Sequence, residues 1–283
     1  MRLARTLGAI GRTCITVGAL LLLFVVYQLW GTGLREQQAQ NRLDNQFEEV
    51  VEAQAAKFPE PADRTATIPP EGDPVAHIEI PKIGVDKVVV EGVGVQDLKK
   101  GPGHYPETPL PGQKGNAAIA GHRTTYGAPF NRVDELQPGD EIFVTTVQGR
   151  FRYLMVEQQI VAPSAVEVLE DKGDNRLTLT ACHPKYSARQ RIIIVAELAA
   201  DADVYEARAV TGPPPAIDHI DGEQGAALPA ILLGLVCALI WLFAWLVGMR
   251  WKRWPSYGIG LPFFLVALFF FFEEFSRFLP SNF

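Results

Sequence analysis

The chain has 283 residues, of which 48% are hydrophobic and 20% are charged, and its formal net charge at pH 7 is -6. This length suffices for one mid-sized domain with appendages, and the acidic balance excludes the basic footprint typical of a nucleic-acid-binding protein. The hydrophobic residues are concentrated in three segments around a long polar-patterned stretch, a distribution that favours a membrane-anchored protein.

The N-terminal region predicts a membrane anchor. A short basic stretch, residues 1–12, precedes the uncharged segment 13–30, "TCITVGALLLLFVVYQLW". This segment is long enough to cross a bilayer. A cleaved signal peptide is the alternative, but no small-x-small cleavage site follows Trp30. We therefore expect an uncleaved transmembrane helix.

Residues 31–75 are expected to connect this helix to a folded domain. In the stretch "LREQQAQNRLDNQFEEVVEAQAAKF" a few mostly apolar residues recur at helical spacing and would form one weak apolar stripe. These residues are Leu43, Phe47, Val50, Val51 and Gln54. It predicts a stalk helix, since a coiled coil would need a longer register. The following "PEPADRTATIPPEGDP" predicts an extended proline-rich spacer.

From residue 76 to residue 199 the sequence consists of short alternating or apolar runs separated by Gly and Pro. The runs "AHIEI", "DKVVVEG", "NAAIAGH", "DEIFVTTV", "GRFRYLMVEQQIVA", "LTLTAC" and "QRIIIVAEL" predict strands. Such a set predicts a mainly β fold, a closed or nearly closed barrel rather than an α/β sheet. The one short helix is expected at 129–136, "PFNRVDEL".

The C-terminal part contains two further apolar segments, and basic residues indicate the topology of all three. These basic residues are Arg2, Arg5, Arg12, Arg250, Lys252 and Arg253. The positive-inside rule places both clusters in the cytoplasm and the middle domain outside it. The expected order is a cytoplasmic N-terminus 1–12, transmembrane helix 13–30, stalk helix and linker 31–75, barrel 76–199, linker 200–227, transmembrane helix 228–248, cytoplasmic loop 249–257, transmembrane helix 258–275 and tail 276–283.

The placement of the cysteines points to chemistry at one position. Of three cysteines, Cys14 and Cys237 lie in apolar segments, and Cys182 is alone in the predicted external domain. Exported domains normally keep cysteines in pairs, so a solitary thiol is either buried and inert or kept for a reaction. Cys182 ends the run "LTLTAC", and the end of a strand at a barrel rim holds a side chain rigidly while leaving it open to solvent.

A thiol with a pKa of about 8.5 needs nearby cations to become a good nucleophile at neutral pH. Arg191 begins the next predicted strand, so a hairpin would bring it alongside Cys182, where its guanidinium can hold an oxyanion. His122 ends "NAAIAGH", and a histidine at such a strand end suits general acid–base catalysis. The alternative for His122 is a surface histidine with ordinary partners.

These motifs resemble the sortase family of cysteine transpeptidases. The segments that carry the resemblance are "NAAIAGHRTTYGAPFNRVDELQPGDEI" and "LTLTACHP" with the following arginine, and "GPGHYPETPLPGQKGN" resembles the class E branch of actinobacteria. The resemblance covers about residues 76–199, and it implies an eight-stranded β-barrel with His122, Cys182 and Arg191 as catalytic residues. Where the family motif has Thr before the cysteine, this chain has Ala181, which predicts reduced or redirected selectivity rather than an inactive protein.

The resemblance implies a Gram-positive, membrane-anchored transpeptidase that needs neither a cofactor nor a metal. Its partners would be secreted proteins with a C-terminal LPXTG-like or LAXTG-like sorting signal and the amine of a peptidoglycan precursor. Cys182 would attack the Thr carbonyl, Arg191 would steady the oxyanion, and His122 would act first as acid and then as base. The residues expected to contact the signal are Tyr105, Thr180, Ala181 and His183.

Four alternatives remain open at this stage. A pilin-polymerising sortase often carries an Asp-Pro-aromatic plug, but Val75 follows Asp73 and Pro74. An L,D-transpeptidase places His and Gly shortly before its cysteine, which "TLTACHP" does not. A non-catalytic membrane-tethered binding module is the third, and a zinc site is the fourth, although zinc ligands tend to come in closely spaced pairs. The candidate zinc ligands are His104, His122, Cys182 and His183, and a candidate calcium cluster, more simply a solvated loop, is Glu167, Glu170, Asp171 and Asp174.

Overall fold

The computed structural model describes residues 2–60, 68–200, 204–205, 227–250 and 253–278. The chain divides into two compact units, one of residues 1–28 with 220–281 and one of residues 29–219 with the last two residues. Most of the linker predicted at 200–227, part of the proline-rich spacer and the last residues of the tail lie outside the described residues.

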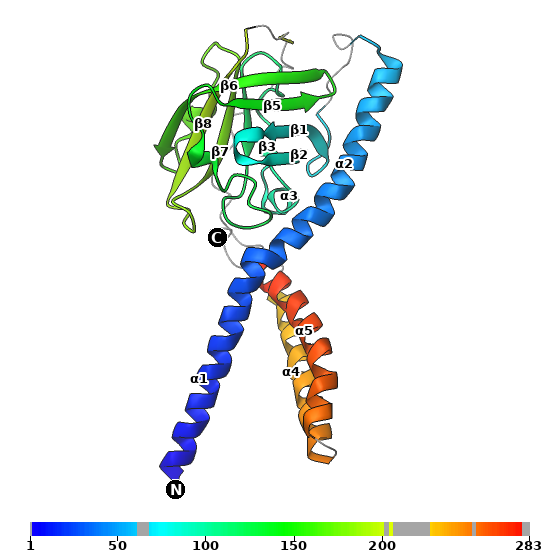
Figure 1. Ribbon diagram of the computed structural model, residues 1–283, viewed down its shortest axis with the longest axis vertical. Coiled ribbons are helices and arrows are strands. Elements are labelled where there is room, and N and C mark those ends of the chain that lie inside the picture. Colours follow the sequence, from blue (N-terminus) through cyan, green and yellow to red (C-terminus); the bar gives the residue numbers. More distant parts are fainter. Residues whose placement is uncertain (1, 61–67, 201–203, 206–226, 251–252, 279–283) are drawn as a thin grey trace. The chain divides into compact units, whose positions relative to one another are not determined.

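The second unit contains a closed β-barrel of eight strands, as predicted from the strand pattern (Figure 1). The strands are β1 Pro74–Ile80, β2 Val85–Glu91, β3 Gly103–His104, β4 Asn116–Ala120, β5 Glu141–Thr146, β6 Gly149–Val161, β7 Arg176–His183 and β8 Gln190–Leu198. Their order around the barrel is β1-β2-β3-β4-β7-β8-β6-β5. Two pairs, β2 with β3 and β4 with β7, are parallel, and the β4–β7 pair is the one that positions the candidate site.

Alternate residues of each strand fill the barrel. On β7, Leu177, Leu179 and Ala181 belong to the central hydrophobic cluster. The intervening Thr178 and Thr180 lie on the opposite face, where they are buried under neighbouring loops. A strand whose two faces are both covered is apolar or hydrogen-bonded throughout, and this explains why "LTLTAC" alternates leucine with threonine.

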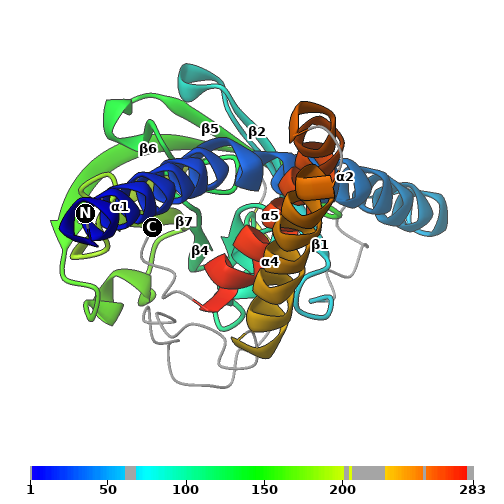
Figure 2. The ribbon, with the colours of Figure 1, turned by 90° about the horizontal axis from the view of Figure 1, so that it is seen from below.

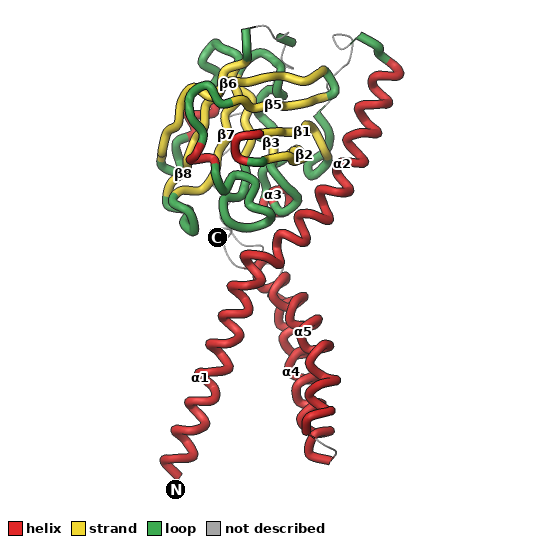
Figure 3. Tube along the Cα trace, in the orientation of Figure 1, coloured by secondary structure: helices red, strands yellow, loops and turns green. Residues whose placement is uncertain are grey.

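Short helical turns connect the strands (Figure 3). They are η3 Pro81–Ile83, α3 Val95–Leu98, η4 Val133–Glu135 and η5 Val166–Leu169. The helix predicted at 129–136 is therefore reduced to the single turn η4. Pro138 disfavours helical backbone at Gln137, and the amide of Phe130 donates to the carbonyl of His122 instead of starting a helix (N···O 3.1 Å).

Helix α2, Thr32–Lys57, packs against the barrel and is not a free stalk (Figure 1). Leu43 and Phe47 contact Val88 and Val90 of β2 in one buried cluster. Val50, which the predicted stripe included, is 44% exposed. The buried side of α2 continues toward its N-terminus through three polar residues, Thr32, Glu36 and Gln40. Polar residues do not contribute to a hydrophobic stripe, so the sequence pattern did not predict that this side of α2 contacts the barrel.

The first unit contains the apolar helices. Helix α1, Arg2–Val26, runs through a π-helical turn, Tyr27–Gly31, directly into α2. Helices α4, Ala227–Arg250, and α5, Arg253–Phe278, lie side by side (Figure 2). Three helical segments are long and apolar enough to cross a membrane, Thr6–Lys57, Leu228–Arg250 and Tyr257–Ser276, close to the three predicted ones. A glycine at position 260 brings α5 near Ala244 of α4, since a Cβ there would lie 3.0 Å from the Ala244 Cβ.

Candidate active site

The strand register places Cys182 and Arg191 in one row, and His122 lies just past the end of the neighbouring strand β4. On the parallel pair β4–β7, Ala120 lies opposite Thr180, and the amide of residue 121 donates to the Thr180 carbonyl (3.0 Å). His122 follows the end of β4 by two residues. On the antiparallel pair β7–β8, Cys182 lies directly opposite Arg191. The predicted hairpin between Cys182 and Arg191 is thus confirmed.

This row lies on the outer face of the barrel wall, near the ends of the strands. Since Leu179 and Ala181 point into the core, alternation directs Thr180 and Cys182 outward. Ala181 is 4% exposed and packs in the core cluster. This placement does not favour contact between the Ala181 side chain and a substrate, and that contact stays a prediction. The missing threonine hydroxyl changes the core behind the nucleophile, not the surface that a peptide would meet.

Burial raises the pKa of the Cys182 thiol above its ordinary value, whereas the charges of Arg191 and Arg123 lower it. The raising effect is the larger one, because removing a charged sulfur from water is costly. At neutral pH Cys182 is therefore a thiol in the resting site. To act as a nucleophile it would have to lose its proton to a neighbouring base.

The imidazole of His122 is suited to take that proton. Burial, together with the positive charge of Lys99, lowers its pKa from 6.5 to about 4. It is therefore neutral at pH 7, and its Nε2 is buried without a hydrogen-bond partner among the described residues. The ring of Tyr126 lies 5.1 Å from the His122 ring, at an interplanar angle of 35°. A neutral, desolvated imidazole whose Nε2 has no partner among the described residues can accept a proton from a nearby donor.

Beside Cys182, Arg191 has hydrogen-bond donors that its contacts with the described residues do not use. Its side chain is largely buried, at 8% exposure. Its hydrogen bonds to the described residues both use Nη1, which donates to the carbonyls of Ala188 (3.0 Å) and Gln190 (3.2 Å). These bonds fix the guanidinium next to Cys182 while Nε and Nη2 remain available for a developing oxyanion.

Two of the expected substrate-contacting residues meet next to the nucleophile. The phenol of Tyr105 and the hydroxyl of Thr180 are hydrogen-bonded (3.0 Å), and both side chains are buried. Tyr105 packs in a second cluster, outside the barrel core, with Val93 and Leu169. His183, one residue beyond the nucleophile, is half-buried, and its Nδ1 has no hydrogen-bond partner among the described residues.

The geometry does not favour the metal alternatives. His104 is fully buried and already engaged, because its Nδ1 lies 2.8 Å from Glu91 Oε2 and its Nε2 lies 3.0 Å from the Pro109 carbonyl oxygen. In the candidate calcium loop, Asp174 pairs with Arg176. Within the described parts of the chain, no three His, Cys, Asp or Glu side chains are grouped closely enough to hold a metal ion.

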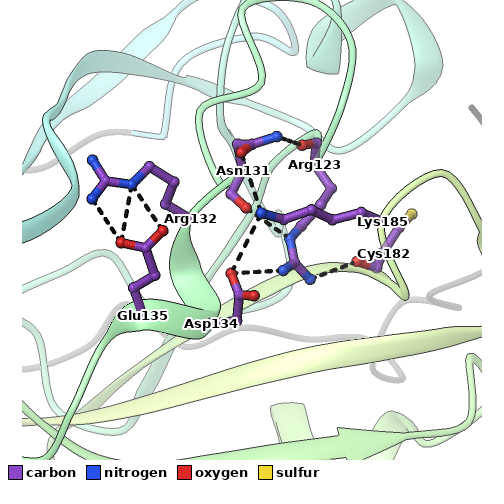
Figure 4. Close-up of polar contacts among 7 residues, drawn as sticks. All are labelled: Arg123, Asn131, Arg132, Asp134, Glu135, Cys182 and Lys185. Carbon is purple, nitrogen blue, oxygen red and sulfur yellow. Dashed lines mark hydrogen bonds and ion pairs between the residues drawn. The ribbon is translucent and has the colours of Figure 1, made fainter.

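Arg123 is a site residue that the motif analysis missed. Its guanidinium is buried at 3% exposure, and its donors reach the carbonyls of Asn131 (3.2 Å) and Cys182 (3.2 Å) and the carboxylate of Asp134 (2.8 Å). Figure 4 shows this guanidinium between Asp134 and the backbone of Cys182. The available signal in the sequence was an arginine directly after His122, which was read only as part of a motif.

The N-terminal turns of α2 support the loop that follows His122. The amide of Tyr126 donates to Thr32 Oγ1 (3.1 Å), and Glu36, paired with Lys87 (2.7 Å), lies under residue 127. That residue must be glycine, since its φ is 71° and a Cβ would lie 2.4 Å from Glu36 Oε2. Burial raises the pKa of the Glu36 carboxyl, although Lys87 opposes the effect.

Comparison with known proteins identifies the family. A family model described as the sortase domain matches residues 78–199. Sortase D of Bacillus subtilis is 34% identical over 142 residues, which span 46% of this chain and 70% of that protein. The chain belongs to the sortase family. Sortases are cysteine transpeptidases, so the resemblance read from the sequence is confirmed.

The sortase relatives include class E members. Sortase SrtE1 of Streptomyces coelicolor is 36% identical over 202 residues, which span 66% of this chain and 55% of that protein. This sortase thus covers about half the length of that relative. Among solved structures, a sortase D5 transpeptidase of Clostridium perfringens is 31% identical with a TM-score of 0.50, over 58% of this chain and 99% of that one.

Proposed function

We propose that this sortase cleaves an LPXTG-like or LAXTG-like sorting signal between Thr and Gly and joins the released carboxyl end to a cell-wall amine. The observation that carries the proposal is that Cys182 lies opposite Arg191 and that His122 follows the end of β4, the strand paired with β7. A nucleophile, a base and an oxyanion donor are the set that acyl transfer needs.

In the first half-reaction the Cys182 thiol gives its proton to His122, and the sulfur attacks the Thr carbonyl carbon. The electron pair of the carbonyl moves to oxygen, where Nε and Nη2 of Arg191 stabilise the negative charge. The tetrahedral intermediate collapses, the Thr–Gly C–N bond breaks, and the glycine nitrogen takes the proton from the His122 imidazolium. A thioester on Cys182 remains.

In the second half-reaction an amine attacks the thioester carbonyl. His122 is neutral again and accepts the proton that the amine loses, in keeping with its low pKa (about 4). Arg191 stabilises the second oxyanion, the C–S bond breaks, and the Cys182 thiolate recovers its proton from the imidazolium. An amide replaces an amide, so the exchange needs neither an external energy source nor a redox partner.

Tyr105, Thr180 and His183 are proposed to contact the sorting signal. Support comes from the Tyr105–Thr180 hydrogen bond (3.0 Å) and from the positions of Thr180 and His183 close to Cys182 on β7. Selectivity for Ala over Pro in the signal is proposed to depend on this hydroxyl pair.

Attachment of proteins to the wall fits the chain better than pilin polymerisation does. Asp73 and Pro74, the candidate plug, lie at the start of the barrel sheet. The amide of Glu91 donates to the Asp73 carbonyl (2.9 Å), and Pro74 pairs with Val90. Residues held in the sheet in this way are not available to plug the site.

The basic residues before the first apolar segment and between the second and third apolar segments support a cytoplasmic N-terminus and an extracytoplasmic barrel.

The test is product analysis with the purified full-length protein in detergent. LPXTG and LAXTG peptides are incubated with a short glycine peptide or diaminopimelate as the amine, and products are identified by mass spectrometry. We expect cleavage after Thr and an amine-dependent ligated product, both lost in Cys182→Ala. Cleavage at another bond, or turnover that survives in Cys182→Ala, would contradict the proposal.

A further inference from the structure

Backbone pairing between β4, which ends two residues before His122, and β7, which carries Cys182, stops short of these two residues. At the end of this pair the amide of residue 121 donates to the Thr180 carbonyl (3.0 Å). Beyond it, the described contact that links the two strand ends is made by a side chain. Arg123 Nη1 donates to the carbonyl oxygen of Cys182 itself (3.2 Å).

The same guanidinium also holds the loop that returns from His122. Arg123 Nε donates to the carbonyl of Asn131 (3.2 Å), and Asn131 Nδ2 donates back to the carbonyl of Arg123 (2.8 Å). Asp134 Oδ1 receives Nη2 (2.8 Å). One planar fork thus connects three acceptors from two segments, the loop of Asn131 and Asp134 and the end of β7, which fixes their relative positions more rigidly than a single bond does.

A residue from the turn after the nucleophile joins this network. Lys185 Nζ lies 3.4 Å from Asn131 Oδ1 and 3.9 Å from Asp134 Oδ1. Figure 4 shows Lys185 approaching Asp134 from the side of Cys182. Because Lys185 follows Cys182 in sequence, the network holds the nucleophile from its carbonyl and from the chain beyond it.

We propose that Arg123 is a positioning residue that sets the distance between His122 and Cys182. It touches the backbone of the nucleophile and not the reacting atoms. The proposal rests on the transpeptidase function proposed above, and it assigns a task to a residue outside the three catalytic positions. Proton transfer and attack depend steeply on such distances, and a shift of about 1 Å can cost about 100-fold in rate.

The charge of Arg123 has a second consequence, which can be separated from its geometry. Together with the stronger influence of Arg191, it lowers the pKa of the Cys182 thiol. A lysine at position 123 keeps the charge but has a single ammonium that cannot reach three acceptors. A methionine keeps an unbranched stem and loses both the charge and the hydrogen-bond donors. The two substitutions therefore distinguish electrostatic support from positioning.

The experiment compares Arg123→Lys and Arg123→Met with Arg132→Met in the full-length protein. Arg132 belongs to the same loop, but it is exposed and pairs with Glu135 (2.6 Å). We expect kcat to fall about 10- to 100-fold in both Arg123 variants, with KM changed by less than about twofold. Alkylation of Cys182, followed on its own peptide by mass spectrometry, should slow several-fold in Arg123→Met and stay near wild type in Arg123→Lys. Arg132→Met should match wild type throughout.

Two outcomes overturn the proposal. One is a kcat in both Arg123 variants equal to that of Arg132→Met, and the other is an effect on KM alone. Thermal unfolding checks that each variant is folded. Should neither Arg123 variant fold, Asp134→Ala decides, because it keeps the guanidinium and removes one of its acceptors. We then expect kcat to fall several-fold while alkylation is not slowed, and an unchanged kcat overturns the proposal. The alkylation assay needs no peptide substrate, so it tests the effect of Arg123 independently of transpeptidation. Absence of transpeptidation by the wild-type protein would contradict the proposed function and not the result of the alkylation assay.

Discussion

The Cys182 thiol and the His122 imidazole are both neutral at pH 7. Burial raises the pKa of Cys182 and lowers that of His122 to about 4. The ion pair of thiolate and imidazolium is thus a minor form in the resting site. In the proposed reaction the proton would therefore pass between them at the moment of attack, so a residue that fixes their distance, as proposed for Arg123, would matter as much as one that carries charge.

A pH-dependent loss of stability follows from His122. Its folded pKa, about 4, lies below its ordinary value of 6.5. Between these values the unfolded chain binds more protons, so stability falls as pH drops from 6.5 toward 4, by at most about 1.4 kcal/mol per pH unit. Chemical unfolding of wild type and His122→Gln at several pH values measures this. A difference between the two proteins that does not change across this window would contradict the burial of a neutral imidazole.

The effect of Arg191 on the thiol should exceed that of Arg123. Arg191 is the larger of the two influences that lower the pKa of Cys182, and it lies directly opposite the nucleophile. Arg191→Met is expected to slow alkylation of Cys182 at neutral pH more than Arg123→Met does, and to lower kcat by about 100-fold or more through loss of the oxyanion donor. Equal or faster alkylation in Arg191→Met would show that its charge does not reach the sulfur.

At this scale the sequence predicted the residues with a distinctive chemical setting. A lone external cysteine, an arginine at the start of the next strand and a histidine at a strand end were each recognisable from position. The core position of Ala181 was not predicted because strand alternation, which directs its side chain into the core, was not applied to the motif. Arg123 was missed because its three partners come from segments that only the fold brings together.

Helix α2 is an integral element of the barrel unit. Gln40 pairs with the edge of β2 as a strand would, since its Nε2 donates to the Val88 carbonyl (3.0 Å) and its Oε1 accepts from the Val88 amide (2.8 Å). Nε2 also donates to the Lys100 carbonyl (2.9 Å). The buried amide thus satisfies backbone groups that would otherwise lack partners.

The replacement Gln40→Ala tests this docking, with Gln38→Ala as the matched control on the exposed side of the same helix. Loss of the bonds to Val88 and Lys100 leaves buried backbone groups unpaired and should lower the free energy of unfolding by about 1–3 kcal/mol. Gln38→Ala should change it by less than about 0.5 kcal/mol. Equal values for the two variants, measured by denaturant unfolding, would mean that α2 does not dock.

Elements with strong periodicity or apolar character were predicted, and elements defined by tertiary contact were not. Seven strands showed alternation or continuous apolar runs, but β3, Gly103–His104, is too short to show either. The docking side of α2 is half polar, and its partners lie in β2. An ectodomain that begins at residue 60 would remove this helix from the barrel, so functional work should retain residues from Leu29 onward.

At the scale of the whole molecule, the three apolar helices were predicted because length and composition alone identify them. Their topology is testable with the natural cysteines. Cys14 and Cys237 lie in apolar helices, and Cys182 lies in the barrel unit. In intact cells a small membrane-impermeant thiol reagent is expected to label Cys182, and Cys182→Ala should abolish the labelling. Labelling that requires permeabilised cells would place the barrel in the cytoplasm.

The most direct measurement of the central claim is the intact mass of the full-length sortase after incubation with a sorting-signal peptide in the absence of an added amine. The account predicts that the protein gains the mass of the peptide up to and including Thr, that hydroxylamine removes the adduct, and that Cys182→Ala never forms it. An adduct on another residue, or peptide cleavage in Cys182→Ala, would contradict the claim that this thiol is the nucleophile.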